Sequence, residues 1–213
     1  MNIEIKISKK PVEYTKAIKF LEKRLINLKK QKASELVWIL EHPNVYTGGT
    51  SYKDFEILDK NIKIIKTNRG GKTTYHGPGQ RIVYMLIDLN HRQKDIRKFI
   101  SIVENSLISF LDEYDIQAKS FKDRVGIWVI KSNKNNFDKE RKIGAIGLRL
   151  SKWVTYHGLS FNINPDLKYY DSIHSCGLND YKNTSLEELG INITHNDFDE
   201  KFAKILLKNI SNF

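Results

Sequence analysis

The sequence predicts an α+β fold: a single domain over residues 1–213, in which a mixed β-sheet is flanked by a few helices. Three observations predict it. Apolar residues recur at helical spacing early, midway and late in the chain, many short apolar or alternating runs lie between them, and several of these runs follow one another at hairpin-like distances. A chain of 213 residues can bury one large core but is short for two domains.

The first half of the chain alternates helix and strand signals. Residues 3–7 alternate apolar and polar side chains, which is typical of a half-buried strand. A helix follows Pro11, because apolar side chains recur there every three or four residues opposite a lysine-rich face. Short apolar runs at 36–40 and 62–65 predict strands, and the first leads into a polar, glycine-bearing turn at 41–49. The helical positions are Tyr14, Ile18, Leu21, Leu25 and Leu28.

The second half predicts two more helices and most of the sheet. Strands are expected over residues 81–89 and 125–130, and over the hairpin-like pair 142–150 and 154–163. An asparagine-rich stretch at 132–138 predicts a flexible hairpin loop. Helical spacing marks the two helices, one by Ile96, Ile100, Val103, Leu107 and Phe110, the other over residues 198–210. Thr184 or Ser185 with Glu187 or Glu188 three residues later resembles a capping box.

Composition and charge narrow the function classes. Lysine plus arginine exceed aspartate plus glutamate by 36 − 25 = 11, so the surface should attract acidic partners, although charge alone does not choose among nucleic acid, membrane and protein. The basic residues are scattered, and a solvated lysine-rich surface is their ordinary interpretation. The N-terminus has no apolar core of signal-peptide length, and the longest apolar run is residues 82–87. The single cysteine, Cys176, excludes an internal disulfide, so we expect a cytoplasmic protein.

Residues 69–80 (RGGKTTYHGPGQ) combine four glycines with one proline. This composition disfavours a helix or a central strand, so we expect a shaped loop anchored by strands at both ends. Residues 71–73 imitate the end of a phosphate-binding P-loop, but that pattern needs a glycine where Lys66 stands. Two interpretations remain, a tight connection between strands and a backbone surface that a ligand approaches closely. In the second, the polar contacts would come from Arg69, Lys72, Tyr75 and His76.

Cys176 lies in the segment HSCGL at 174–178. A lone cysteine is more often a small buried hydrophobe than a nucleophile. This one, however, lies in a polar segment and precedes a glycine whose N–H can approach a bound oxygen. A nucleophilic thiol needs a partner that favours the thiolate, and spacing leaves Lys142, His76, His157 and His174 open. A zinc site of His174, Cys176 and His157 is a weaker alternative, because it lacks a second pair of closely spaced ligands.

Several long motifs carry a resemblance to a known family. They are residues 69–80 (RGGKTTYHGPGQ), 142–149 (KIGAIGLR), 153–160 (WVTYHGLS) with 162–167 (NINPDL), and 176–178 (CGL), and residues 41–47 (EHPNVYT) add a fifth match. In this order they resemble the octanoyltransferase family of lipoate biosynthesis, over roughly residues 36–190. The resemblance implies the fold of the biotin and lipoate protein ligases.

The resemblance also implies an activity and a site. Octanoyl would pass from the thioester of acyl carrier protein to Cys176, and then to the lysine amine of a lipoyl domain. Cys176 would be the nucleophile, and Lys142 would lower its pKa and move protons. The lipoyl domains would be those of 2-oxoacid dehydrogenase E2 subunits and of the glycine cleavage H protein, and the enzyme would be a monomer that uses no cofactor, metal, nucleic acid or membrane. The acyl substrate would contact Arg69, Gly70, Gly71, Lys72, Thr73, Thr74, Tyr75, His76, Ala145, Ile146, Gly147, Gly158, Leu159 and Ser160.

The implied chemistry is consistent with these residue types. A free thiol has a pKa of about 8.5, so an adjacent ammonium is needed to raise the thiolate fraction at neutral pH. Thioester exchange is nearly balanced and transfer to an amine is downhill, so no ATP is required. An eight-carbon chain gains about 0.8 kcal/mol for each buried methylene, which calls for an apolar slot.

Three alternatives compete with this interpretation. An ATP-dependent lipoate or biotin protein ligase would share the fold, but no counterpart of the Gly-Arg-Gly-Arg loop of biotin ligases is present. A basic nucleic-acid-binding module would use the positive charge but would not explain Cys176 with Lys142. Lys142 could instead belong to a solvated basic cluster with Lys139 and Arg141. Strand alternation can distinguish a catalytic Lys142 from a solvated one. If Arg141 and Lys142 lie in one strand, their side chains must point to opposite faces.

Overall fold

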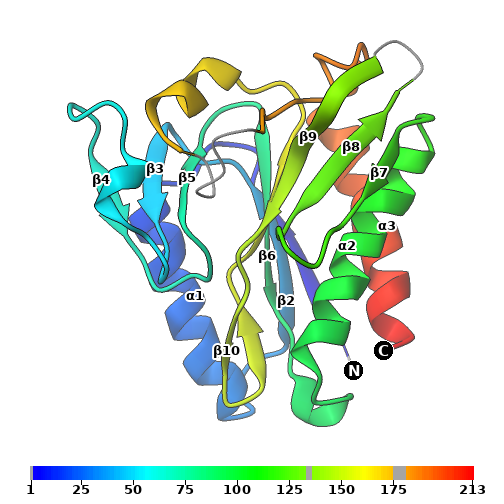
Figure 1. The fold of residues 1–213 in the computed structure, drawn as a ribbon. Coiled ribbons are helices and arrows are strands. Elements are labelled where there is room, and N and C mark those ends of the chain that lie inside the picture. The colour runs from blue at the N-terminus through cyan, green and yellow to red at the C-terminus, as the bar shows by residue number, and fades with distance from the viewer. Residues whose placement is uncertain (1, 133–135, 175–180) are drawn as a thin grey trace.

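The computed structural model describes residues 2–132, 136–174 and 181–213. A seven-stranded mixed sheet runs through it in the order β1-β2-β6-β12-β9-β8-β7 (Figure 1). β1 and β2 pair in parallel, and the other neighbours pair antiparallel. The strands are β1 (Ile3–Ile7), β2 (Glu35–Leu40), β6 (Gln80–Leu86), β7 (Gln117–Lys119), β8 (Ile127–Lys131), β9 (Asn136–Ile146) and β12 (Gly158–Asn162).

Helices flank this sheet, as the sequence predicts, and they cover both of its faces. α1 (Tyr14–Lys29) packs on one face, and α2 (Ile96–Asp112) and α3 (His195–Ser211) lie side by side on the other (Figure 1). Successive residues of β2 divide between the two faces: Trp38 packs with the α1 cluster and Val37 with the α2 and α3 cluster. A strand that is buried on both sides reads as a continuous apolar run, which explains residues 36–40.

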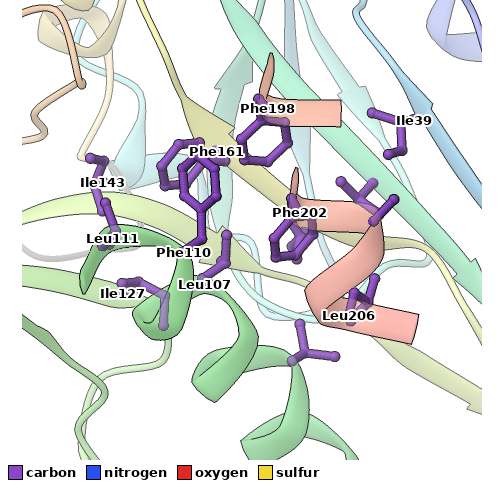
Figure 2. Packing of buried hydrophobic residues seen from close by; sticks show 14 of the residues in the cluster. Ile39, Leu107, Phe110, Leu111, Ile127, Ile143, Phe161, Phe198, Phe202 and Leu206 are labelled. Carbon is purple, nitrogen blue, oxygen red and sulfur yellow. The ribbon is translucent and has the colours of Figure 1, made fainter. Parts of the chain in front are cut away.

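Aromatic rings fill the core under α2 and α3 (Figure 2). Phe161 of β12 and Phe198 of α3 stack with centroids 5.0 Å apart, and Phe110 of α2 meets Phe198 edge-on at 5.1 Å. Such pairs add about 0.5–1.5 kcal/mol to the burial of their surface. This core holds β12, which carries part of the site, rigidly against the helices.

A smaller three-stranded sheet, in the order β4-β3-β5, corrects one expectation from the sequence. It consists of β3 (Val45–Gly48), β4 (Ile64–Lys66) and β5 (Thr73–His76). β3 lies inside the stretch predicted as a turn, and β5 lies inside the glycine-rich stretch predicted as a loop throughout. These strands form because β3 and β5 satisfy each other's backbone groups across a long sequence separation, which local composition does not reveal.

The two long strands expected near residues 142–163 are each divided in two. β9 ends at Ile146, and β10 (Arg149–Ser151) then pairs with β11 (Val154–Tyr156) as a separate hairpin. His157, with φ +62°, separates β11 from β12. The expected loop at 132–138 is shorter than predicted, since Asn136 already lies in β9, and residues 133–135 are outside the described part of the chain.

The capping signal at Thr184 and Ser185 does not begin a helix. Thr184 Oγ1 donates to Glu188 Oε2 at 2.6 Å and the Glu188 N–H donates to Ser185 Oγ at 3.2 Å, but they close a turn at 186–190. A capping box does precede α3, at Thr194 with Asp197. The remaining elements are the 3-10 helices η1 (Asp54–Glu56), η2 (Leu89–His91) and η3 (Leu167–Ser172). Among the described residues, each helix is too short or too polar to cross a bilayer.

Candidate active site

A cavity of about 320 Å³ lies between the two sheets and beside α1. Its volume is in the range of small-molecule sites, about 300–1,000 Å³. β5 and the loop before it form one wall, while β6, β9 and β12 form the opposite wall. Of the residues predicted to act in a site, those that line this cavity are Arg69, Gly70, Gly71, Lys72, Thr74, His76, Lys142, Ala145, Ile146, Gly147, Gly158, Leu159 and Ser160. Segments from three distant parts of the sequence therefore meet in one place.

Two predicted substrate contacts, Thr73 and Tyr75, point away from the cavity. Alternate side chains of a strand face opposite sides, and in β5 it is Thr74 and His76 that face the cavity. Thr73 binds the buried carboxylate of Glu56 through both its N–H (2.8 Å) and its hydroxyl (2.6 Å). The ring of Tyr75 stacks on another tyrosine ring at 4.7 Å, within the aromatic cluster below the small sheet.

Lys142 is buried at the cavity, with 5% of its surface exposed. A β-bulge beside it sets the direction of its side chain: Ile127 pairs with Gly144 and Trp128 pairs with Lys142, so Ile143 is an extra residue in β9. Bulges of this kind re-aim a neighbouring side chain. The backbone of Lys142 is fixed on its other side too, by hydrogen bonds with residues 182 and 184 of 2.9 and 2.8 Å.

The ammonium of Lys142 is held between a glycine and an indole. Its Nζ lies 5.4 Å from the centre of the Trp128 ring. Gly126 has φ +131°, and a Cβ placed there would lie 2.5 Å from Lys142 Cε and 2.7 Å from the Gly144 carbonyl oxygen. The lysine side chain can therefore occupy its position only because residue 126 has no side chain.

The neighbouring basic residues have different surroundings. Arg141 forms an ion pair with Glu188, N–O 2.8 Å, and its guanidinium lies over the Phe137 ring. Lys139 is exposed. Strand alternation separates Lys142 from this solvated pair, as we expected if the strand includes both Arg141 and Lys142.

Arg69 braces the loop in front of β5. Its guanidinium donates to the carbonyl oxygens of Thr47 (2.8 Å), Gly70 (3.0 Å) and Lys72 (2.7 Å) and to the Thr47 hydroxyl. These bonds join the loop to β3 and fix its shape. Arg69 lines the cavity, but most of its donors are used to hold the backbone.

The two sheets approach each other through glycine backbone at this loop. A Cβ at Gly70 would lie 2.9 Å from the Leu148 carbonyl oxygen, and a Cβ at Gly147 would lie 3.2 Å from the Gly70 carbonyl oxygen. A Cβ at Gly70 would therefore force the backbone to shift, whereas one at Gly147 would make a tight contact. The glycines of the two motifs therefore permit a close contact between sheets, and the cavity opens beside it.

A buried histidine and a tyrosine form one polar pair at the cavity. His42 is fully buried, and Nδ1 must donate to the Val12 carbonyl oxygen at 2.6 Å. Its Nε2 therefore accepts from the Tyr84 hydroxyl at 2.7 Å, in the neutral imidazole. Burial lowers the pKa of His42 to about 4, so this neutral form is the stable one.

Two histidines, His76 and His157, line the cavity itself in neutral form. His76 Nδ1 donates to the side-chain oxygen of Gln80 at 2.6 Å, and His157 Nε2 donates to that of Asn68 at 2.7 Å. Burial lowers the pKa of each to about 3, helped by nearby positive charge. His157 has a left-handed backbone, φ +62°, a conformation that is found at functional sites more often than elsewhere.

These histidines should make the fold sensitive to acid. In the folded protein they stay neutral, but in the unfolded chain they bind protons below about pH 6.5. Their contribution to the free energy of unfolding is therefore fully present above that pH and is lost as the pH drops toward 3–4. The expected loss is about 1.4 kcal/mol per pH unit for each histidine inside this window. Urea unfolding at pH 7 and pH 5 measures it. His157→Gln should reduce the slope and His91→Gln, at an exposed site, should not; equal stability at both pH values would contradict this account.

Several cavity residues were not predicted from the sequence. Tyr14 belongs to the apolar stripe of α1 and was assigned only to packing, and Ile82 and Tyr84 were assigned to a buried strand. His157 was considered only as a partner for the thiol or as a zinc ligand. Arg124 also lines the cavity, where its guanidinium contacts three aromatic rings. A polar hydroxyl in an otherwise apolar stripe was the one signal that could have identified Tyr14.

The predicted nucleophile, Cys176, lies outside the described residues, and so does its assignment to zinc. His174 is described, and its N–H donates to the Glu56 carbonyl oxygen at 2.8 Å. Within residues 2–132, 136–174 and 181–213, histidine and acidic side chains do not gather in a group of three or more that could hold a metal.

The sequence model of the lipoyl protein ligase A/B catalytic domain family matches residues 13–207. The chain belongs to this family. Curated relatives include the octanoyltransferase of Nitrobacter hamburgensis, which is 43% identical over 199 residues that cover 92% of this chain and 82% of that protein. The octanoyltransferase of Wolbachia pipientis is 43% identical over 195 residues, 91% of this chain and 93% of that protein. These findings confirm the resemblance that the five motifs carry, and they identify the chain as an acyltransferase.

Solved structures of the family and its neighbours have the same fold. Lipoate-protein ligase A bound with ATP gives a TM-score of 0.69 at 13% identity, covering 100% of this chain and 85% of that one. A bi-partite lipoate protein ligase with its E2 lipoyl domain from Thermoplasma acidophilum gives 0.68 at 12%, covering 99% and 84%. Biotin protein ligase from Aquifex aeolicus gives 0.57 at 14%, covering 100% and 71%. The predicted fold of the biotin and lipoate protein ligases is confirmed.

Proposed function

We propose that the protein transfers an octanoyl group from octanoyl-acyl carrier protein to a lysine of lipoyl domains, through an acyl thioester on Cys176. The observation that carries this proposal is a buried lysine, Lys142, at a cavity built from the family's glycine-rich motifs. Burying an ammonium costs free energy, and buried ionisable groups at cavities are frequent in active sites, so the place of Lys142 favours catalysis over a surface role.

Contacts made by the described residues on either side of Cys176 support the proposal that its thiol lies near the ammonium of Lys142. On one side, His174 is bound to Glu56, whose carboxylate holds the first residue of β5. On the other side, the Lys182 carbonyl oxygen accepts from the backbone N–H of Lys142 at 2.9 Å. Both ends of the segment that contains the cysteine are therefore anchored to strands that line the cavity.

The proposed reaction has two acyl transfers. The Cys176 thiolate attacks the thioester carbonyl, a new C–S bond forms, and the carrier thiol leaves and takes up a proton. The amine of the acceptor lysine then attacks the acyl-cysteine, a C–N bond forms and the C–S bond breaks. Lys142 supports the thiolate in the first transfer, and it relays the proton that the acceptor amine loses to the cysteine sulfur in the second.

The walls of the cavity suit the chain that would be transferred. Ile82, Ile146 and Leu159 are apolar lining residues next to the glycine backbone. Each methylene buried there would contribute about 0.8 kcal/mol. Neutral histidines and tyrosines, among them His76, His157 and Tyr84, also line the cavity beside its charged residues.

Acidic protein partners fit the surface of the chain. Its excess of 36 − 25 = 11 positive charges would steer carrier proteins of opposite charge toward it. The acceptors would be lipoyl domains of 2-oxoacid dehydrogenase E2 subunits and the glycine cleavage H protein, and an E2 lipoyl domain accompanies the structurally similar ligase of Thermoplasma acidophilum. The proposed transfer consumes no ATP and would take place in the cytoplasm.

Incubation with octanoyl-acyl carrier protein should add one octanoyl group to the enzyme. The adduct should be released by hydroxylamine, because thioesters are labile to it, and should be absent from Cys176→Ser. Intact-mass spectrometry without added ATP measures it, and addition of a lipoyl domain should move the octanoyl group to that domain. An adduct that persists in Cys176→Ser, or no adduct in the wild-type protein, would remove the assigned nucleophile.

A further inference from the structure

A second hollow lies next to the cavity of the candidate active site, on the other side of Tyr14. A surface groove of about 590 Å³ lies between α1 and β4 and includes Ile18 and Ile65 in its lining. Tyr14 lines both the cavity and the groove. Its side chain, which is 4% exposed, therefore lies between the two spaces.

The partition between cavity and groove consists of two hydrogen-bonded pairs. The Tyr14 hydroxyl donates to Thr67 Oγ1 at 3.1 Å, and His157 Nε2 donates to Asn68 Oδ1 at 2.7 Å. Thr67 and Asn68 line the groove, while His157 lines the cavity. The Tyr14 ring also packs edge-on against His42 at 5.2 Å, so its position is fixed from behind.

Strand register gives the depth of the cavity. The Lys142 ammonium lies near the level of Gly144, since both are beside Gly126, and Gly144 pairs with Phe161 of β12. The partition lies near the level of Tyr84, which shares His42 with Tyr14 and pairs with Gly158. Phe161 and Gly158 are three residues apart, which is about 10 Å at the usual rise of a strand. That depth is close to the length of an extended eight-carbon chain.

We propose that Tyr14 is the end wall that limits the acyl chain to about eight carbons. Its ring closes the cavity at the depth where an octanoyl chain ends, and the groove behind it provides room that a longer chain cannot reach while the ring is present. The assignment rests on the proposed function, because it takes the reacting end of the chain to lie at Lys142. Removing the ring should join cavity and groove and admit longer chains.

A competition between two chain lengths tests this. Wild-type protein and Tyr14→Ala are each given equimolar octanoyl- and dodecanoyl-acyl carrier protein with a lipoyl domain, and the two products are counted by mass spectrometry. Tyr14→Ala should raise the ratio of dodecanoyl to octanoyl product by at least about tenfold, since pockets discriminate one methylene by roughly 10- to 200-fold. Because the ratio is internal to each sample, a partly unfolded variant does not distort it.

Two matched variants separate the wall from general loosening of α1. Tyr14→Phe keeps the ring and loses the bond to Thr67, and Ile18→Ala enlarges the groove without opening the partition; both should keep the wild-type ratio. An unchanged ratio in Tyr14→Ala, or an equal change in Ile18→Ala, would overturn the proposal.

Failure of the proposed function would be recognised separately. If wild-type protein transfers no octanoyl group, the reaction assignment fails, and calorimetry with free octanoic and dodecanoic acids then tests the wall alone. In that measurement Tyr14→Ala should gain at least about tenfold in affinity for dodecanoic relative to octanoic acid. No gain would overturn the wall whatever the reaction.

Discussion

The Lys142→Arg variant should transfer octanoyl to the lipoyl domain about 10²- to 10⁴-fold more slowly than the wild-type protein. Arginine keeps the positive charge, but its guanidinium does not lose a proton near neutral pH, so it cannot relay the proton of the acceptor amine. The larger guanidinium would also have to fit beside Gly126, where the lysine side chain already leaves no room for a Cβ. Loss of the proton relay and the larger size of the group thus both slow the transfer.

Single-turnover kinetics separate the two transfers in this variant. Acylation of Cys176 should be less affected than transfer to the lipoyl domain, because a positive charge near the thiol is retained. Arg141→Lys and Lys139→Ala should keep both rates, since Arg141 pairs with Glu188 on the other side of β9 and Lys139 is exposed. Near-normal transfer by Lys142→Arg would return Lys142 to a structural role.

Adding one methyl group at residue 126 should produce a loss of similar size. Gly126→Ala would place its Cβ 2.5 Å from Lys142 Cε, so the lysine side chain must move. We expect the rate of transfer to fall by at least about 10²-fold, the contribution of a positioned proton-transfer group. Alkylation of Cys176 by iodoacetamide should shift toward higher pH, because the ammonium no longer supports the thiolate. Lys122→Ala, at an exposed position in the same loop, should change neither measurement.

A double-mutant cycle distinguishes displacement of Lys142 from general disruption. If Gly126→Ala acts through the lysine, it should change the alkylation profile of the wild-type protein but not that of Lys142→Ala. Equal shifts in both backgrounds would show that the methyl group disturbs the site by another route. The positive φ of Gly126 adds about 1–3 kcal/mol of strain with alanine, so thermal melts are needed to select a temperature at which both variants are folded.

The helices and the central sheet could be predicted because their signals are local. Apolar residues at helical spacing mark α1, α2 and α3, and runs such as residues 36–40 mark strands buried on both faces. β5 was missed for the opposite reason, since its pairing with β3 depends on residues 25 to 31 positions earlier, from Gly48 with Thr73 to Val45 with His76. The break at His157 was also missed, because a left-handed backbone at a histidine leaves no apolar pattern.

Most of the residues that the motifs place at the expected site lie together at one cavity. The glycine-rich loop, residues 145–147 and residues 158–160 do meet at one cavity with Lys142. Thr73 and Tyr75 were also expected to contact the substrate, but they do not line the cavity. The stretch was interpreted as a loop, whereas residues 73–76 form a strand in which alternate side chains face opposite sides. Tyr14 was not expected at the cavity because an aromatic residue in an apolar helix stripe is usually core, and in the sequence only its hydroxyl sets it apart.

The glycine contact between the two sheets restricts how new substrate preferences can arise. A side chain introduced at Gly70 would meet the Leu148 carbonyl oxygen at 2.9 Å, so the backbone must move before such a substitution can alter the cavity. The wall on α1 is made by one side chain of a surface helix, where smaller residues remove volume without moving backbone. Selection for other acyl chains, in nature or in the laboratory, therefore has its most accessible starting point in the first helix.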